Sequence, residues 1–259
     1  MPHADLQPGP GRIVSGPMET TRPDPILDQL LGLETTKTWS LIATIFGDLD
    51  GDRLSGKELG TLLAPLGVKP EAMRVALHRL KKDGWIISEK NGREVVYALS
   101  DHGRQETFAA QKDVYRRDVK FAEGWRLIML PGEAARPYNG PHIAIDRGLL
   151  LVPKGAGALP ADALELSLVE PIPDWFESRL APPHVWAQAG RLTDLAEQFL
   201  AGPRLGQISA RLMFLHYWRK MALRTGTWAH IGLVPEGTMA NCHAAVTEVF
   251  EQTSRTKIT

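Results

Sequence analysis

The sequence has little cysteine, no net charge and no long apolar run, and each absence narrows the class of protein. Cys242 is the one cysteine, which excludes an internal disulfide framework and favours a reducing compartment. No apolar run approaches the ~20 residues needed to span a bilayer. The 30 basic residues balance 30 acidic ones, so any attraction to nucleic acid must come from a local excess of charge. We therefore expect a soluble, cytoplasmic protein without a membrane partner.

Motifs for catalysis are also missing. The sequence contains no Gly-x-Ser-x-Gly, no Walker A loop, no Rossmann glycine fingerprint and no His-Glu-x-x-His. The adjacent Cys242 and His243 would point about 100° apart on a helix, which does not suit a nucleophile and its base. We interpret the cysteine as a small core residue, and we expect no enzymatic activity, cofactor or metal.

The segment DLDGDRLSGKEL, which begins at Asp48, superficially resembles a calcium-binding loop. That loop requires glycine at its sixth position and glutamate at its twelfth, but Arg53 and Leu59 stand there. We therefore expect no calcium and interpret the acidic residues as a solvated turn. Ser55 and Glu58 fit better as a capping box that begins a helix.

The N-terminal 25 residues include six prolines and predict a flexible arm, followed by a short helix over residues 26–33. Apolar spacing then predicts a buried first helix over residues 36–46. A second helix over residues 56–66 follows the capping box.

Residues 69–103 are the most informative stretch. Pro70 suits the first position of a third helix, and the apolar side chains of this helix form one stripe, namely Met73, Ala76, Leu77 and Leu80. Two β-like segments at residues 85–87 and 95–99 follow, joined across Asn91-Gly92, which is a strong hairpin signal. A basic helix followed by a hairpin with a basic tip is typical of a winged helix-turn-helix.

Between Lys69 and Arg93 the sequence has seven Lys and Arg against three acids. We interpret the third helix as one that enters the major groove, with a solvated helix face as the alternative. Arg74 and His78 are expected at base edges, whereas the lysines and Arg93 would contact phosphates. The predicted DNA-binding residues are Thr36, Lys37, Lys69, Arg74, His78, Arg79, Lys81, Lys82, Lys90, Asn91 and Arg93.

A polar linker helix is predicted at residues 104–120. The run RVALHRLKKDGW, the hairpin, LSDHG, Tyr115 and GWRLIML together resemble the PaaX-like regulators, repressors of phenylacetate catabolism. The resemblance is best over residues 36–131. It implies a winged helix-turn-helix, a small central ferredoxin-like α+β domain and a helical C-terminal domain. It also implies repression of a catabolic operon and release from DNA by the coenzyme A thioester phenylacetyl-CoA.

The central stretch departs from the family pattern. β-like segments are predicted at residues 125–130, 148–152 and 163–169, and a helix at residues 174–180. The segment PGEAARPYNGPHIAIDR stands where the family has a helix between the first two strands. We therefore expect a reduced central domain, in which ligand contacts from that helix are in doubt.

Three helices are predicted in the C-terminal third, from residue 182 to about 200, over residues 206–224 and over residues 238–252. Between Arg204 and His230 the sequence has five Lys and Arg and no acid. Such a basic face suits an anionic ligand such as the phosphates of a CoA ester, or else an interface with a second copy or with acids of the linker helix. The residues assigned to the ligand are Arg211, His216, Arg219, Lys220 and Arg224.

The sequence thus predicts an α+β protein. Its predicted parts are an arm (1–25), a winged helix-turn-helix (26–103), a linker helix (104–120), a reduced central α+β domain (121–181) and a helical domain (182–259). We expect a homodimeric repressor of double-stranded operator DNA, because half-site recognition requires two reading helices. An acyl-CoA effector would bind between the central and C-terminal domains. The alternative is a protein-interaction scaffold that uses the winged fold without DNA or effector.

Overall fold

The structure is a computed structural model that describes residues 25–117, 124–132, 138, 142–155, 157–167, 175–176, 180–203, 207–224, 231 and 237–256. The predicted arm at residues 1–24 and most of the predicted helix at residues 174–180 lie outside this range, as do residues 204–206 and 225–230. The described parts combine helices with antiparallel sheets, so the predicted α+β class is confirmed. No helix among the described residues combines the length and the apolar character of a membrane span.

The elements in chain order are α1 (Pro25–Gly32), α2 (Thr38–Asp48), β1 (Arg53–Ser55), α3 (Gly56–Leu63), the 3-10 turn η1 (Ala64–Leu66), α4 (Pro70–Lys82), β2 (Ile86–Asn91), β3 (Glu94–Leu99), α5 (Asp101–Val114), β4 (Trp125–Met129), β5 (Ile143–Asp146), β6 (Leu149–Pro153), β7 (Leu164–Leu166), α7 (Pro183–Ala201), α8 (Gln207–Arg224) and α10 (Thr238–Gln252).

The predicted capping box at the start of α3 is confirmed. The Glu58 amide donates to Ser55 Oγ (3.2 Å), and the Ser55 amide donates to the Glu58 carboxylate (2.6 Å). This exchange satisfies amides that have no partner within the helix and fixes where α3 begins. α4 then starts at Pro70 as predicted, and its apolar stripe is turned toward the core.

β2 and β3 form the predicted hairpin, but its turn lies one residue further along. Asn91 still pairs with Glu94, so the connection is Gly92-Arg93 instead of Asn91-Gly92. Gly92 has φ of 61°, a left-handed conformation that glycine adopts without strain. β1 was not predicted, and it pairs with β3 to complete a three-stranded sheet in the order β1-β3-β2.

α5 begins at the predicted cap, where the Gly103 amide donates to Ser100 Oγ (3.0 Å). A Cβ at Gly103 would lie 2.1 Å from the Trp85 carbonyl oxygen, so only glycine allows α5 to approach the hairpin this closely. The helix also contacts the C-terminal part of the chain. It lies against α8, and Trp218 Nε1 donates to the Val114 carbonyl at its end (2.8 Å).

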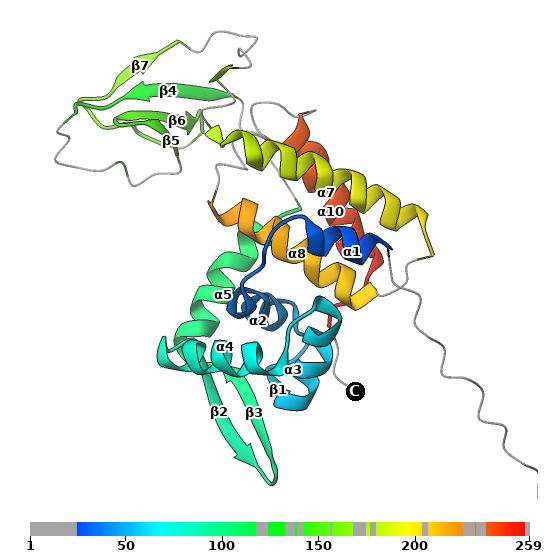
Figure 1. The fold of residues 1–259 in the computed structure, drawn as a ribbon. Coiled ribbons are helices and arrows are strands. Elements are labelled where there is room, and N and C mark those ends of the chain that lie inside the picture. The colour runs from blue at the N-terminus through cyan, green and yellow to red at the C-terminus, as the bar shows by residue number, and fades with distance from the viewer. Residues whose placement is uncertain are drawn as a thin grey trace, which may run out of the picture.

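One hydrophobic core joins the N-terminal and C-terminal helices. Buried side chains from α1 to β2 and from α7 to α10 belong to a single cluster, in which α2 packs on both α4 and α8. Figure 1 shows α7, α8 and α10 stacked beside α1, with α2, α3 and α4 below them. Burial of this continuous apolar surface is the main stabilising contribution to the fold.

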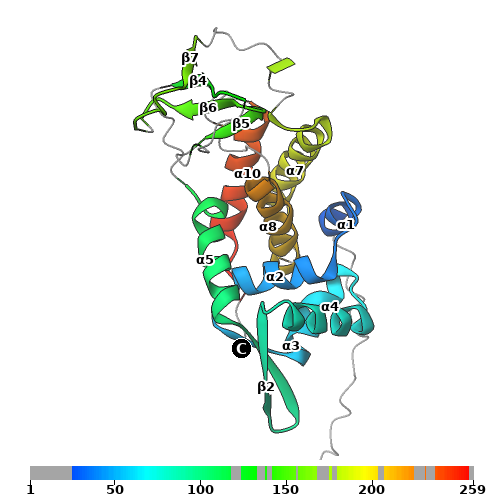
Figure 2. The same cartoon turned by 90° about the vertical axis from the view of Figure 1, so that its left-hand side faces the viewer.

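The strands β4 to β7 form a separate antiparallel sheet in the order β5-β6-β4-β7. β5 lies within the segment PGEAARPYNGPHIAIDR (residues 131–147) and was not predicted as a strand. Successive residues alternate between the faces, so Leu150 and Val152 pack with Ile128, whereas Leu151 packs with Phe176 on the opposite side. In Figures 1 and 2 this sheet and the β2–β3 hairpin lie at opposite ends of the molecule.

Candidate nucleic-acid interface

The face of α4 opposite its buried stripe is exposed along the whole helix. Glu71, Val75, His78 and Lys82 lie on this face, because they recur at the spacings that place residues one above another on a helix. Arg74 lies beside this line, and its pair with Glu71 (3.8 Å) joins two side chains that are each more than 70% exposed. Such an exposed pair contributes little stability, so little holds Arg74 against the helix.

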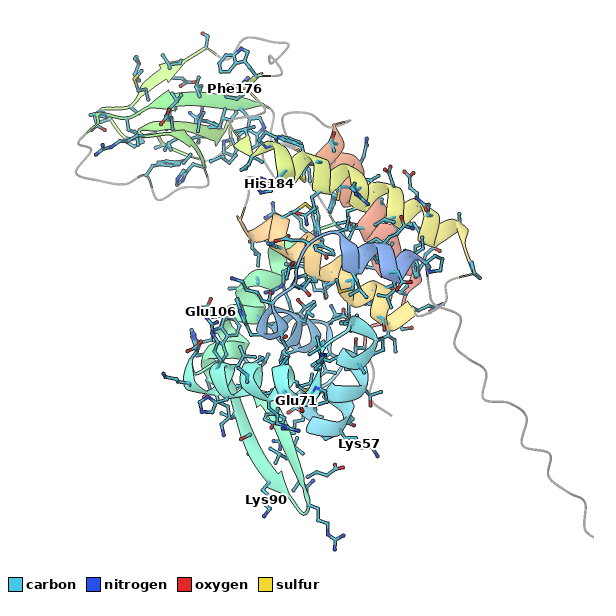
Figure 3. The ribbon with its side chains drawn as sticks, in the orientation of Figure 1. Lys57, Glu71, Lys90, Glu106, Phe176 and His184 are labelled. Carbon is cyan, nitrogen blue, oxygen red and sulfur yellow. The ribbon has the colours of Figure 1, made fainter. Side chains whose placement is uncertain are left out.

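The β2–β3 hairpin is held beside α4 by polar contacts. Lys81 Nζ donates to Ser88 Oγ on β2 (2.7 Å), and Arg53 Nη1 on β1 donates to the Glu89 carboxylate (3.0 Å). Beyond these contacts the hairpin projects away from the body of the protein, and Figure 3 shows Lys90 close to its free end. The helix and the hairpin tip therefore present exposed cations at the same end of the molecule.

The predicted DNA-binding residues fall into two groups. One group lies exposed on or next to α4 and on the hairpin, and consists of Lys69, Arg74, His78, Lys81, Lys82, Lys90, Asn91 and Arg93. The other group is Thr36, Lys37 and Arg79, which line a cavity on the flank of α4 that faces α2. The Arg79 guanidinium lies 5.4 Å from the centre of the Trp39 ring and 3.5 Å from the Asp83 carboxylate. Sequence spacing had placed all of them on a single DNA-binding surface.

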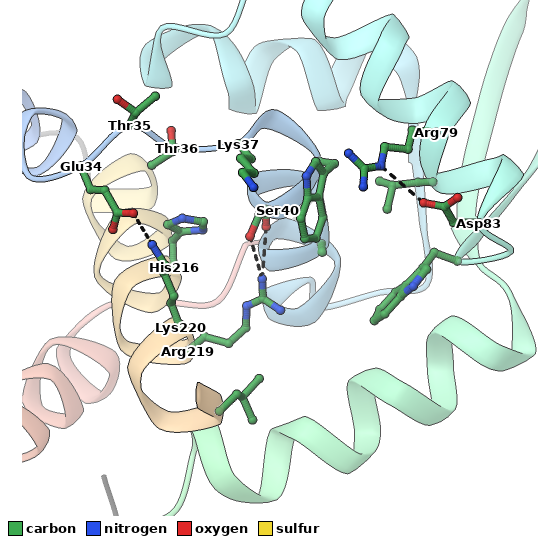
Figure 4. Close-up of a pocket in the computed structure, with 15 residues that line it drawn as sticks. Glu34, Thr35, Thr36, Lys37, Ser40, Arg79, Asp83, His216, Arg219 and Lys220 are labelled. Atoms are coloured by element: carbon green, nitrogen blue, oxygen red, sulfur yellow. Dashed lines mark hydrogen bonds and ion pairs between the residues drawn. The ribbon is translucent and has the colours of Figure 1, made fainter. Parts of the chain in front are cut away.

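The cavity has a volume of about 540 Å³ and lies between α2, the C-terminal end of α4 and α8 (Figure 4). Its charged groups are four cations and two carboxylates, namely Lys37, Arg79, Arg219, Lys220, Glu34 and Asp83. Its apolar wall includes the rings of Trp39 and Trp85 together with Leu80 and Leu223. The cavity thus combines a positive excess with aromatic surface.

His216 lies at the cavity wall, but it is not one of the cations. Burial, with Arg219 and Lys220 nearby, lowers the pKa of His216 to about 4. Its Nδ1 lies 3.2 Å from Thr44 Oγ1 on α2. At neutral pH the ring is therefore uncharged and joins α8 to α2.

Two of the basic residues of α8 are paired with acids of this chain. Arg211 is 2% exposed and donates through Nε (3.1 and 2.9 Å) and Nη2 (2.7 Å) to Asp48, which is 0% exposed. Lys220 pairs with Glu34 just before α2. The two acids lie at the ends of α2, since Asp48 is its last residue and Glu34 lies just before it. The sequence analysis had instead suggested acids of the linker helix. The side chain of Arg224 lies outside the described part of the chain.

The interpretation of Asp48 as part of a solvated turn is also wrong. Besides Arg211, its carboxylate accepts from Tyr115 Oη (3.0 Å) and from the amide and hydroxyl of Thr256 (3.3 and 3.2 Å). Arg211 Nη1 in turn donates to the carbonyl oxygens of Phe250 and Thr253 (2.9 and 3.0 Å). Each guanidinium nitrogen of Arg211 therefore donates to a protein group, and this buried pair ties α8 to α2 and to the end of α10.

The predicted role of Cys242 as a core residue is confirmed. The side chain is fully buried on α10, and this burial raises the pKa of its thiol to about 12. The neighbouring His243 is turned to a different partner, with Nε2 2.8 Å from the Arg116 carbonyl oxygen.

Residues 37–103 match the model of the family described as PaaX-like protein. This range begins next to α2 and ends in α5, so it contains α3, α4 and the hairpin. Over residues 37–103, called the PaaX-like domain below, the chain is similar to this family. The chain is also similar to the transcriptional repressor PaaX of Escherichia coli (strain K12), with 35% identity over 97 residues. That match covers 36% of this chain and 31% of the length of the repressor.

The PaaX-like domain also holds residues that our sequence interpretation missed. Val75, on the outward face of α4, is 71% exposed although it is apolar. Trp39 belongs to the helix that was predicted to be buried, but it is half-buried and lines the cavity. The signal for Val75 was available, because it is an apolar residue that lies off the apolar stripe of its helix.

Proposed function

We propose that this protein is a DNA-binding transcriptional regulator, acting as a repressor, in which residues 26–103 form a winged helix-turn-helix. α3 and α4 would be the helix-turn-helix pair and the β2–β3 hairpin would be the wing. The observation that carries the proposal is the placement of exposed cations on α4 and at the hairpin tip at one end of the molecule (Figures 1 and 3). Similarity to a transcriptional repressor over the same region supports it.

Roles follow from position on this surface. Arg74 and His78 face outward near the start of α4, so we assign them to base edges, with Arg74 suited to a guanine. Lys81 and Lys82 lie nearer the end of the helix, and the hairpin tip carries further cations. These groups suit phosphates, which position a protein on the duplex without specifying sequence.

A salt titration of binding to the upstream region of the chain's own gene tests the proposal. We propose a homodimer, and seven to ten phosphate contacts per dimer predict a log-log slope of about −6 to −9. Absence of binding at low salt would contradict the repressor function and favour the alternative, a protein-interaction scaffold. A slope near zero would contradict the phosphate contacts.

The parts of the chain outside the PaaX-like domain have proposed roles as well. We propose that the sheet at residues 121–181 is a reduced ferredoxin-like domain, because the antiparallel order β5-β6-β4-β7 agrees with the strand order of that fold. We keep the proposed linker segment (104–120), which includes most of α5 (Asp101–Val114), and the proposed helical domain (182–259). The continuous core between α2 and α8 supports close coupling of the DNA-binding and helical parts.

We further propose that an acyl-CoA effector releases the repressor from DNA and binds in the cavity between α2, α4 and α8, in place of the predicted site between the central and C-terminal domains. The volume of about 540 Å³ falls within the range of small-molecule sites. Arg219 and Lys220, two of the residues assigned to the effector, line it together with Lys37 and Arg79. Because Arg79 belongs to α4, a ligand that displaces it would change DNA affinity by linkage.

A thermal-shift panel of acyl-CoA esters against free CoA tests this part of the proposal. A ligand present at 100 times its Kd stabilises the folded state by about 2.7 kcal/mol, which raises the melting temperature. Arg219→Gln should abolish the shift, whereas Arg147→Gln, at the exposed β5–β6 turn, should retain it. A shift that survives Arg219→Gln would place the effector elsewhere.

A further inference from the structure

Val75 is an apolar residue at the centre of the polar face of α4. It is 71% exposed, and it stands between Glu71 and His78 on the line of outward residues. The buried stripe of the helix, which includes Leu77 and Leu80, lies on the opposite side. Val75 is therefore not turned toward the hydrophobic core.

Helix stability does not account for this valine either. β-branched residues lose side-chain freedom in a helix, so alanine or lysine would stabilise an exposed position better. The side chains around it are polar and mostly basic, with Arg74, His78 and Lys82 on the same face. This charge complements a duplex, which identifies DNA as the partner that covers Val75.

The chemistry of valine then selects the base. Guanine, adenine and cytosine present hydrogen-bonding groups but no methyl group in the major groove, and a valine against their hydrogen-bonding groups would leave them without partners. Thymine also presents its 5-methyl group, which packs well against an apolar side chain. We propose that Val75 reads a thymine in each half-site through contact with this methyl group. The inference rests on the proposed function, since it requires α4 to lie in the major groove.

The test uses the full chain and begins with binding sites selected from random duplex DNA. Each thymine of the selected site is then replaced by uracil, which removes the methyl group and leaves base pairing unchanged. At one position per half-site this replacement should weaken binding by about fourfold, the effect of one buried methyl-sized group. If every replacement changes the affinity by less than twofold, the inference is overturned.

Protein variants assign the effect to the residue. The Val75→Ala variant should bind the thymine site about fourfold more weakly than wild type does. It should bind the thymine and uracil sites equally well, because the variant has already lost the contact with the methyl group. Val75→Thr retains a methyl group and should keep part of the preference. Leu164→Ala, at a 56% exposed position on β7, is the matched control and should behave as wild type.

The outcomes separate the inference from the function on which it rests. A chain that selects no DNA contradicts the proposed function itself. A chain that selects DNA, but whose Val75→Ala variant loses affinity equally for thymine and uracil sites, overturns only the role of Val75. Because Val75 is exposed, the variants should melt within a few degrees of wild type, so a loss of binding cannot come from unfolding.

Discussion

Replacing Asp48 by asparagine should destabilise the protein more than any other single charge removal among the described residues. Asp48 and Arg211 are 0% and 2% exposed and are joined by contacts of 2.7 to 3.1 Å. The asparagine side chain would keep the volume of the aspartate, and its single oxygen could still accept from either Tyr115 or Thr256. The Arg211 guanidinium, however, would then be buried without a counter-charge.

The expected loss in the free energy of unfolding follows from the buried charge of Arg211, which would have no counter-charge. Removing one partner of a buried ion pair costs about 3–5 kcal/mol, because the remaining charge keeps its desolvation penalty. Arg211 retains carbonyl partners at Phe250 and Thr253, which reduces the loss, so we expect a value near 3 kcal/mol. A domain of ordinary stability has about 5–15 kcal/mol in total. Asp48→Asn should therefore remain folded at room temperature but melt at a clearly lower temperature.

Urea denaturation of wild type and variant measures the free energy of unfolding. The matched control is Glu34→Gln, which breaks the other ion pair between the α2 region and α8. Lys220 and Glu34 are 32% and 43% exposed, so this control should cost less than about 1 kcal/mol. The double variant Asp48→Asn/Arg211→Met should lose less free energy of unfolding than the single variants Asp48→Asn and Arg211→Met lose together. The difference should be about 1–3 kcal/mol. Equal losses for Asp48→Asn and Glu34→Gln would refute the argument.

Three further measurements test other parts of the structure. Arg74→Ala should relax the sequence preference at one or two base pairs, whereas Lys90→Ala should lower the affinity for all DNA sequences similarly. If both variants behave alike in a sequence-selection assay, the assignment of Arg74 to a base edge and Lys90 to a phosphate is wrong. The pKa of His216 falls from 6.5 to about 4 on folding, so the unfolded chain binds the extra proton between these values. The free energy of unfolding should therefore decrease by up to about 3 kcal/mol as the pH falls through this window, and His216→Asn should flatten that decrease. Ser55→Ala should lower the urea-derived stability by about 1 kcal/mol through loss of the helix cap; an unchanged value would contradict the importance of the bond from Glu58 to Ser55.

The elements that the sequence predicted best are those whose signals are local. The apolar stripe of α4, the proline at its start and the capping box of α3 each involve residues within one or two helical turns. β1 and β5 were missed because three- and four-residue strands carry almost no periodicity, and β1 pairs with a strand beyond α3 and α4. The hairpin turn was shifted by one residue because Asn91 can continue the strand while glycine supplies the turn.

The candidate site was predicted only in part, for a related reason. Local charge counts predict the cations on α4 and on the hairpin. They do not predict that Arg79 lines the cavity, because this depends on where α2 and α8 pack. The bond between Asp48 and Arg211 joins residues 163 positions apart, and no spacing rule reaches that far. A weak signal did exist, because Arg211 precedes the apolar run LMFL and so had to be buried with its helix.

The two ion pairs of α8 hold opposite ends of α2, and they differ in how readily they can open. Asp48 ends α2 and its pair with Arg211 is buried, whereas Glu34 precedes α2 and its pair with Lys220 borders the cavity. An anion in the cavity would compete with Glu34 for Lys220, because that exchange replaces a partly exposed carboxylate by another solvent-accessible anion. It would not compete with Asp48, whose displacement would leave a charge buried without a partner. A ligand in the proposed effector cavity would therefore act on the start of α2, while the end of α2 would stay fixed to α8. The resulting motion of α2 would be a tilt about Asp48, which is transmitted to α4 because the two helices pack together.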